Sequence, residues 1–309
     1  MGEALQALLG NINPYLLQII VNIGIGIVLA LGLNVITGLT GQLSLGHAAF
    51  MSVGAFSSAL LTIHTGLPFS VNLLLTGMIT AGVGVVIGYP ILRLTGDYLA
   101  ICTLGFAEIV KVIFLNLDIT NKALGLSVPP PHTSIPMPIM VWIVVILTII
   151  VVSFIHNSRF GRALKAICGD EIAAEAMGIN VARYKVQSFA IGTFLAGVGG
   201  GLYAHFISYI NPSDFGFLKS IDILSMVVLG GLGSIPGSVI GATILSAAPE
   251  FLRFMASYRM LVYGGLLVFM MIFRPNGLMG GINFTEVVLR AIGRKPHMKE
   301  LMKQEKPEQ

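Results

Sequence analysis

Charged residues are scarce in this chain of 309 residues. Only 10% of its residues are Asp, Glu, Lys or Arg, against 55% hydrophobic residues, and the mean hydropathy is +0.88. Such a composition excludes a water-soluble globular domain, and the apolar runs are long enough to cross the roughly 30 Å hydrocarbon core of a bilayer. We therefore expect a polytopic membrane protein.

The chain also lacks the residues that most enzyme and metal sites need. Its two cysteines, Cys102 and Cys168, form no CxxC pair and no disulfide framework. Its six histidines form no HxxxH or HExxH set, which argues against a metal site and against a membrane enzyme. No glycine is followed by lysine, so the GxxxxGK phosphate loop is missing. We expect no catalytic residue, no metal and no ATP site in this chain.

The net charge of +4 has a topological explanation, and no nucleic-acid partner is expected. Most basic residues fall on one side of the apolar blocks, whereas few fall on the other: Lys122, Lys219, Arg253 and Arg259. The positive-inside rule then makes the loop 156–186 and the C-terminal tail cytoplasmic, and places 118–137 outside. The N-terminus lacks the basic region of a signal peptide, so the first apolar run is expected to remain as a span.

The apolar blocks predict nine membrane spans. They lie near 16–36, 47–64, 69–92, 97–117, 138–157, 186–209, 221–233, 237–250 and 257–275. One alternative remains: if the Gly-rich stretch 37–47 is half of a broken helix, the count becomes ten and the N-terminus moves inside. Within the span 186–209, small residues recur every fourth position and predict close helix packing at Gly192, Ala196, Gly200 and Ala204.

Two Gly-rich segments interrupt the apolar pattern, GLTGQLSLGHAAF at 38–50 and GGLGSIPGSVIGA at 230–242. Such breaks free backbone groups that hydrocarbon cannot satisfy, so they survive only against protein or a water-filled cavity. One break in each half of a membrane protein points to a translocation path. The candidate path residues are Gln42, Ser44, Gly46, His47, Gly231 and Gly233. The alternatives are ordinary turns between spans and, for His47, a hydrogen-bonded structural histidine.

Glu108 and Lys111 are charged residues inside the span 97–117. Their spacing of three residues places them on one helical face, where each offsets the charge of the other. Because a charge facing lipid at mid-membrane costs about 2.5–3.5 kcal/mol, we expect this pair to face the bundle or an aqueous cavity. Contact with substrate and a purely structural role both remain open.

The loop SRFGRALKAICGDEIAAEAMGINVARYK, between the fifth and sixth spans, predicts two short helices on the cytoplasmic face. Helix-forming residues run from Phe160 to Cys168, Gly169 breaks the helix, Asp170 can cap the next one, and Gly178 can end it in a left-handed turn. The second helix is alanine-rich with an acidic edge, which suits docking into a groove on another protein. A helix lying on lipid headgroups would instead favour lysine and arginine.

From about Asn34 to Leu278 the sequence resembles the permease subunits of bacterial ABC importers for branched-chain amino acids, of the LivM type. The resemblance rests on NVITGLTGQLSLGHAAFMSVGAF, GDYLAICTLGFAEIVKVIFLN, NKALGL, the loop FGRALKAI to DEIAAEAMGIN, GGLGSIPGSVIGA and FRPNGL. It implies an all-α transmembrane bundle of about 8–10 spans over 1–283, with a coupling loop at 158–185 and a cytoplasmic polar tail at 284–309. The implied ATPase-coupling residues are Gly161, Arg162, Glu171, Ala173, Ala174, Glu175 and Gly178. The EAA pattern of such permeases finds Ile172 where glutamate is expected.

The same resemblance implies import of branched-chain amino acids across the bacterial inner membrane. This chain would hold no cofactor, because ATP and Mg²⁺ bind two separate ATPase subunits. A second permease of the LivH type, a periplasmic amino-acid-binding protein and membrane lipid would be its other partners. The alternatives are a permease for other amino acids, urea or short amides, or an ion-coupled secondary transporter. The last would need cation-binding acids at mid-membrane, where only Glu108 qualifies and Lys111 can neutralise it.

Overall fold

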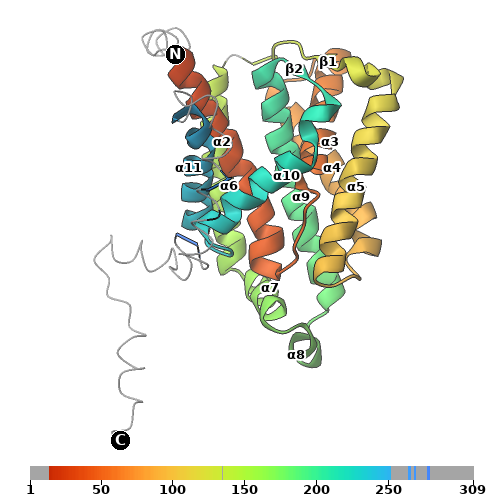
Figure 1. Cartoon of the computed structure of the whole chain (residues 1–309), viewed down its shortest axis with the longest axis vertical. Helices are drawn as coiled ribbons and strands as arrows, with labels where there is room; N and C mark the ends of the chain where they lie inside the picture. Colours follow the sequence, from red (N-terminus) through yellow and green to blue (C-terminus); the bar gives the residue numbers. More distant parts are fainter. Residues whose placement is uncertain (1–13, 134, 252–263, 266–267, 269–276, 279–309) are drawn as a thin grey trace, which may run out of the picture.

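The computed structural model describes residues 14–133, 135–251, 264–265, 268 and 277–278. Helices dominate this part of the chain, as expected, and most run lengthwise through one bundle (Figure 1). The helices of the bundle are α2 (Pro14–Leu33), α3 (His47–Thr65), α4 (Phe69–Ile91), α5 (Asp97–Asn116), α6 (Met137–Asn157), α9 (Val181–Ile207), α10 (Phe217–Gly230) and α11 (Ile235–Phe251).

Six helices in the described part are long and apolar enough to cross a membrane. The first is Tyr15–Gly38, which comprises α2 and the helical turn that directly continues it. The other five are α3, α4, α5, α6 and α9. Their bounds agree with the first six predicted spans to within five residues, which confirms an all-α polytopic bundle. The largest difference is in α9, which begins at Val181 rather than at 186, because the side chain of Asn180 caps it by accepting a hydrogen bond from the Arg183 amide at 3.0 Å.

The two later helices are shorter. At about 1.5 Å per residue, the 14 residues of α10 span about 21 Å, less than the bilayer core. The sequence predicted a helix at 221–233, but α10 does not cross the core by itself and lies obliquely across the bundle (Figure 1). Helix α11 covers the predicted span 237–250. The predicted span 257–275 and the polar tail 284–309 lie outside the described residues, apart from three positions of the former.

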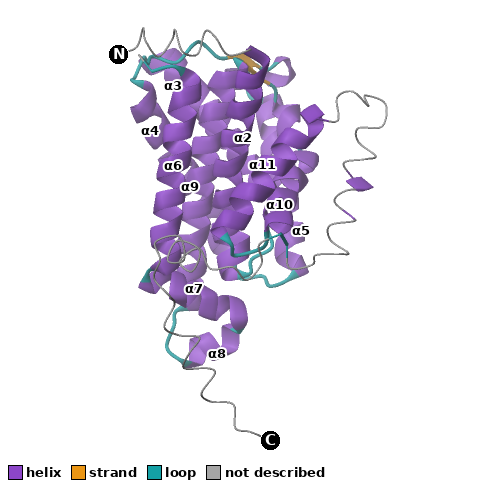
Figure 2. Cartoon of the chain, turned by 90° about the vertical axis from the view of Figure 1, so that its left-hand side faces the viewer, coloured by secondary structure: helices purple, strands orange, loops and turns teal. Residues whose placement is uncertain are grey.

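One end of the bundle is formed by the loops after α5 and α9. The first loop contains two 3-10 turns, η2 (Asp118–Thr120) and η3 (Lys122–Leu124), and a short strand β1 (Leu126–Ser127). Strand β1 pairs antiparallel with β2 (Tyr209–Ile210), which precedes the 3-10 turn η4 (Pro212–Phe215). The helices α7 (Arg159–Gly169) and α8 (Glu171–Ala176) project from the opposite end (Figure 2).

The segment 37–47 supplies no additional span. Helix α2 continues into the π-helical turn η1 (Asn34–Gly38), after which 41–46 forms no regular helix and leads into α3. The start of α2 therefore lies at the β1–β2 end of the bundle, opposite α7 and α8 (Figure 1). The structure therefore shows no separate half-helix at 37–47, which the alternative of ten spans would require.

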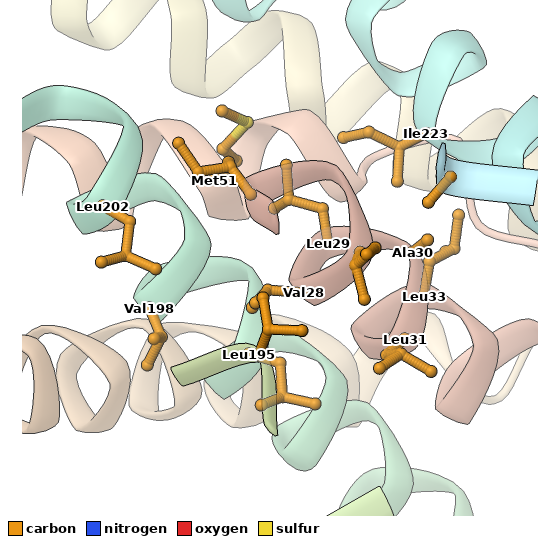
Figure 3. Packing of buried hydrophobic residues seen from close by; sticks show 14 of the residues in the cluster. Val28, Leu29, Ala30, Leu31, Leu33, Met51, Leu195, Val198, Leu202 and Ile223 are labelled. Atoms are coloured by element: carbon orange, nitrogen blue, oxygen red, sulfur yellow. The ribbon is translucent and has the colours of Figure 1, made fainter. Parts of the chain in front are cut away.

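Helix α9 forms the centre of the bundle and packs against α2, α3 and α4. Figure 3 shows Leu195, Val198 and Leu202 of α9 facing apolar side chains of α2 and α3. The predicted strip of small residues lies in these contacts: Ala196 and Ala204 are fully buried, and a Cβ on Gly200 would collide with the carbonyl oxygen of Met51. The prediction of close helix packing is confirmed.

Candidate functional site

The first Gly-rich break is held inside the bundle by hydroxyl groups of neighbouring helices. The backbone amide of Leu45 donates to Thr103 Oγ1 of α5 at 3.0 Å, and the amide of Ala48 donates to Ser220 Oγ of α10 at 3.1 Å. Gly46 packs directly on the carbonyl oxygen of Thr103, where a side chain would not fit. The free backbone groups thus find protein partners, which is the condition for irregular backbone at membrane depth.

The second break meets the first through Asn34. The amide of Gly233 donates to Asn34 Oδ1 at 2.8 Å, and Asn34 Nδ2 donates to the carbonyl oxygen of Ser234 at 3.4 Å. Gly231 and Gly233 have φ angles of +110° and +76°, which favour glycine and turn the chain from α10 into α11. Asn34 was not among the predicted site residues. In the structure Asn34 is buried in a π-helical turn, a feature common at functional sites, whereas the sequence shows only a single amide within an apolar run.

Three predicted path residues carry polar side chains that are buried without hydrogen bonds. Gln42, Ser44 and His47 are each at most 3% exposed. Within the described residues, their side-chain nitrogen and oxygen atoms have no hydrogen-bond partner of normal geometry. His47 Nε2 lies beside Gly32 of α2, close to Leu195 of α9. Because buried polar groups are normally paired, these three side chains are unusual within the bundle.

The six predicted path residues do not form one cluster. Gly233 lies against Gly38 at the start of the first break, on the side of the bundle that leads to α7. Gly46 and His47 lie deeper, between α2, α5 and α9. The structure therefore brings the two breaks together at Asn34 and separates Gly231 and Gly233 from His47.

Glu108 and Lys111 form the expected ion pair, with Lys111 Nζ 3.4 Å from Glu108 Oε2. Both side chains are partly exposed, at 46% and 29%, so the pair lies at the surface of this chain and not within its core. Lys111 Nζ also reaches Gly216, at the start of α10. The pair thus lies beside the junction of α5 and α10.

The loop after α6 folds into the two predicted helices, with the predicted caps. Asp170 Oδ1 accepts hydrogen bonds from the amides of Ile172 and Ala173 at 2.9 and 3.0 Å. Gly178 has a φ of +83° and follows α8. Ser158 caps α7 by accepting from the Gly161 amide at 3.1 Å. The internal order of this loop was therefore correctly predicted from its capping residues.

Helices α7 and α8 are tied to α9. The carboxylate of Glu171 forms an ion pair with Lys185. Phe160 of α7 stacks on Tyr184 of α9 with ring centroids 5.5 Å apart. On α7, burial lowers the pKa of the Lys165 ammonium, whose Nζ donates to His156 Nε2 at 2.8 Å. Helices α7 and α8 together form a knob, residues 159–176, that projects from the bundle. Side-chain contacts connect this knob both to α6, which precedes it in the chain, and to α9, which follows it.

The two sides of α8 differ in exposure. Ala174 is 4% exposed and packs inward, so it cannot present a surface to a partner. The side chains that project outward are Ile172 and Met177, which are 82% and 83% exposed. The physical reason is that Glu171 pairs with Lys185 and turns its side of the helix toward α9.

The remaining coupling candidates divide in the same way. Gly161 is buried, and a side chain there would collide with the carbonyl oxygen of Ile155, so it serves the α6–α7 packing. Ala173, Glu175 and Gly178 are exposed on α8 and its end. Arg162 is also exposed and donates from Nη1 to the carbonyl oxygen of Asn157 at 3.2 Å.

No group of three or more His, Cys, Asp or Glu side chains that could hold a metal occurs among the described residues. A groove of about 360 Å³ does lie beside α8, between the end of α4 and the start of α9. Its lining includes Arg93, Thr95, Glu171, Ile172, Glu175 and Lys185. The arrangement offers buried polar groups, a hydrogen-bonded junction between the two breaks and a protruding pair of helices, α7 and α8.

Comparison with known proteins agrees with this geometry. Residues 15–271 match the family described as branched-chain amino acid transport system / permease component. The high-affinity branched-chain amino acid transport system permease protein LivM of Salmonella typhimurium is 37% identical, over 82% of this chain and 67% of that protein. The permease protein BraD of Pseudomonas aeruginosa is 30% identical, over 87% of this chain and 97% of that protein.

A second type of permease is also similar. The permease protein LivH of Salmonella typhimurium is 37% identical over 47% of this chain and 47% of that protein. No solved structure matches the chain significantly. The family match covers all six long apolar helices apart from the first residue of α2. This multi-pass membrane protein therefore belongs to the permease components of branched-chain amino acid transport systems.

Proposed function

We propose that this chain is the membrane-spanning subunit of an ATP-driven importer that carries branched-chain amino acids across the bacterial inner membrane. A second permease of the LivH type completes the path, two ATPase subunits hold ATP and Mg²⁺, and a periplasmic binding protein delivers the substrate. Family membership supports the transport role, and the names of the relatives support the substrate class.

The observation that carries the coupling part of this proposal is the attachment of the knob to the centre of the bundle. Helix α8 is held to α9 by the Glu171–Lys185 pair, and α7 is held to α9 by the stack of Phe160 on Tyr184. Helix α9 in turn packs against α2, α3 and α4. A displacement of α8 therefore moves the helix around which the others are arranged.

In the proposed cycle, binding of ATP closes the two ATPase subunits, which draw α8 with them through its exposed apolar side chains. The movement of α9 reaches the two breaks, whose relative position depends on the hydrogen bonds of Asn34. Opening at one end and closure at the other then exposes the buried polar groups of Gln42, Ser44 and His47 to each side in turn. This chain binds and guides the solute, and its residues break no covalent bond.

Uptake into proteoliposomes tests the function. The assembled importer should accumulate radiolabelled leucine when the binding protein is added on one side and ATP is present on the other. Uptake should continue in the presence of ionophores and should stop when the ATPase subunits carry an inactive phosphate loop.

Two results would contradict the proposal. Uptake by this chain alone, abolished by ionophores, would identify an ion-coupled secondary transporter. ATP-driven uptake of urea, short amides or polar amino acids in preference to leucine, valine and isoleucine would retain the importer and reject the substrate class.

A further inference from the structure

A cavity of about 360 Å³ lies between α2, α9, α10 and α11, away from the groove beside α8. Tyr203 and Ile207 come from the last turns of α9, and Lys219 comes from the first turn of α10. Pro249 comes from the end of α11. These helix ends lie on the β1–β2 side of the bundle, so the cavity occupies the half opposite α7 and α8 (Figure 1).

The cavity leads toward the first break. Met51 of α3 belongs to its lining and lies one helical turn after His47. A solute in the cavity would thus be separated from the buried polar groups of the break by one layer of side chains. The volume lies within the range of small-molecule pockets, about 300–1,000 Å³.

The lining is mostly apolar and carries one charge of each sign among the described residues. Its apolar members include Ile25, Leu29, Ile223, Met226 and Leu245. Its two charged members are Lys219 and Asp222, three residues apart on α10. At that spacing their Cβ atoms are about 5–6 Å apart on the same helical face. Lys219 Nζ also lies 5.4 Å from the ring centroid of Tyr203, which holds the ammonium at the cavity wall by a cation–π contact.

We propose that this cavity is an entry subsite for a free α-amino acid with an apolar side chain, an inference that rests on the proposed import function. Lys219 receives the α-carboxylate and Asp222 receives the α-ammonium. The hydrocarbon side chain packs against Ile25, Leu29 and Met226.

The charge arrangement explains why a zwitterion is the matching ligand. Its two charged groups are separated by a single carbon atom, so both can reach partners that are neighbours on one helical face. Removing ions from water is costly unless each is paired, and the cavity pairs both at once. A solute with only one of the two charges would leave Lys219 or Asp222 without a counterpart from the ligand. A polar side chain in the position of the hydrocarbon would lie against Ile25, Leu29 and Met226, which offer no hydrogen-bonding side chain.

Protection of a cysteine from alkylation tests the subsite. Ser246 lines the cavity, and Ser246→Cys in a background with Cys102→Ser and Cys168→Ser gives one reactive thiol. In the assembled importer, leucine should slow modification by a membrane-impermeant thiol reagent. Leucinamide lacks the carboxylate and 4-methylpentanoate lacks the ammonium, so each should protect at least about tenfold less well than leucine.

Charge variants assign the two partners. Lys219→Met should abolish the advantage of leucine over leucinamide, and Asp222→Asn should abolish its advantage over 4-methylpentanoate. The matched control is Lys122→Met, which removes a lysine from the same end of the molecule, where Lys122 pairs with Asp118 at 2.7 Å outside the cavity. It should leave all three protection values unchanged.

The possible failures are distinguishable. Equal protection by leucine and leucinamide overturns the subsite even if a charge variant does not assemble, because that comparison uses the unaltered Lys219 and Asp222. ATP-driven leucine uptake without protection of the thiol also rejects the subsite, and it leaves the import function intact. Protection with the expected ligand preference, but without ATP-driven uptake, rejects the import function instead.

Discussion

The ammonium of Lys185 at the start of α9 forms an ion pair with the carboxylate of Glu171 in α8, and the side chain of Lys185 is only 8% exposed. This contact joins the protruding knob to the central helix of the bundle. It also explains why one flank of α8 turns inward and the other stays free.

Removing the carboxylate of Glu171 should weaken the attachment of α8 to α9. Glu171→Gln leaves the buried charge of Lys185 without its partner, a change that costs up to about 3–5 kcal/mol in buried pairs and less here, because Glu171 is one-third exposed. We expect a lower thermal unfolding midpoint and lower uptake, with partial recovery in the double variant Glu171→Gln, Lys185→Met. The control Glu175→Gln alters an exposed acid of the same helix that forms no ion pair with Lys185, and it should leave the unfolding midpoint unchanged. An equal effect of both single variants would contradict the role of the pair.

The exposed apolar side chains of α8 should determine binding of the ATPase. Ile172→Arg and Met177→Arg place a charge on the outward face and should weaken copurification of the ATPase by at least about tenfold, with unfolding midpoints unchanged. Ala174→Arg would force a charge into a buried position and should lower the unfolding midpoint itself. If Ala174→Arg proved stable and removed only ATPase binding, the inward orientation of Ala174 would be wrong.

Asn34 should be needed to hold the two breaks together. Asn34→Leu leaves the amide of Gly233 without its partner, at about 1–3 kcal/mol for a buried group. It also removes one donor to the Ser234 carbonyl oxygen, which keeps its hydrogen bonds from Ser238. Asn34→Asp keeps the acceptor for Gly233 and loses the donor to Ser234, so it should have an intermediate effect on stability and uptake. Asn116→Leu is the control, because Asn116 is exposed and bonds only within its own helix. Equal stability and uptake of Asn34→Leu and Asn116→Leu would show that the hydrogen bonds of Asn34 do not hold the two breaks together.

The contact of α9 with α3 should not tolerate a side chain at Gly200. Gly200→Val would drive a branched side chain into the Met51 carbonyl oxygen and separate the two helices. Overpacking of this kind costs about 1–3 kcal/mol or more, measurable by thermal unfolding in detergent. Gly82→Ala, in α4, is the matched control, because no atom lies within 4 Å of an added Cβ there. If Gly82→Ala lowered the unfolding midpoint as much as Gly200→Val does, the loss of stability in Gly200→Val would not come from a collision with Met51.

The sequence predicted the long helices well because their limits depend on local signals. Apolar runs of membrane length end at polar or Gly-rich segments, and the coupling loop carries its own caps at Asp170 and Gly178. The shorter α10 was harder to delimit, because its amphipathic start at Phe217–Asp222 contains charges that lower its hydropathy. Those charges belong to a helix whose first turns line a cavity.

The parts of the site that could not be predicted depend on contacts between distant segments. Asn34 forms hydrogen bonds with Gly233 and Ser234, about two hundred positions away, and no local sequence pattern predicts that pairing. The inward turn of Ala174 depends on Lys185, which lies beyond the end of the helix that carries Ala174. Helical periodicity places residues on a face, but it does not say which face a neighbour covers.

The pairing of Leu126 with Ile210 fastens the loop after α5 to the connection that starts α10. The side chain of Asn211 reinforces it, because its Nδ2 donates to the carbonyl oxygen of Ala123 at 3.1 Å. These two stretches of chain cannot shift independently. A force applied to either stretch therefore reaches the other and the first turn of α10, so this end of the bundle responds as one mechanical unit.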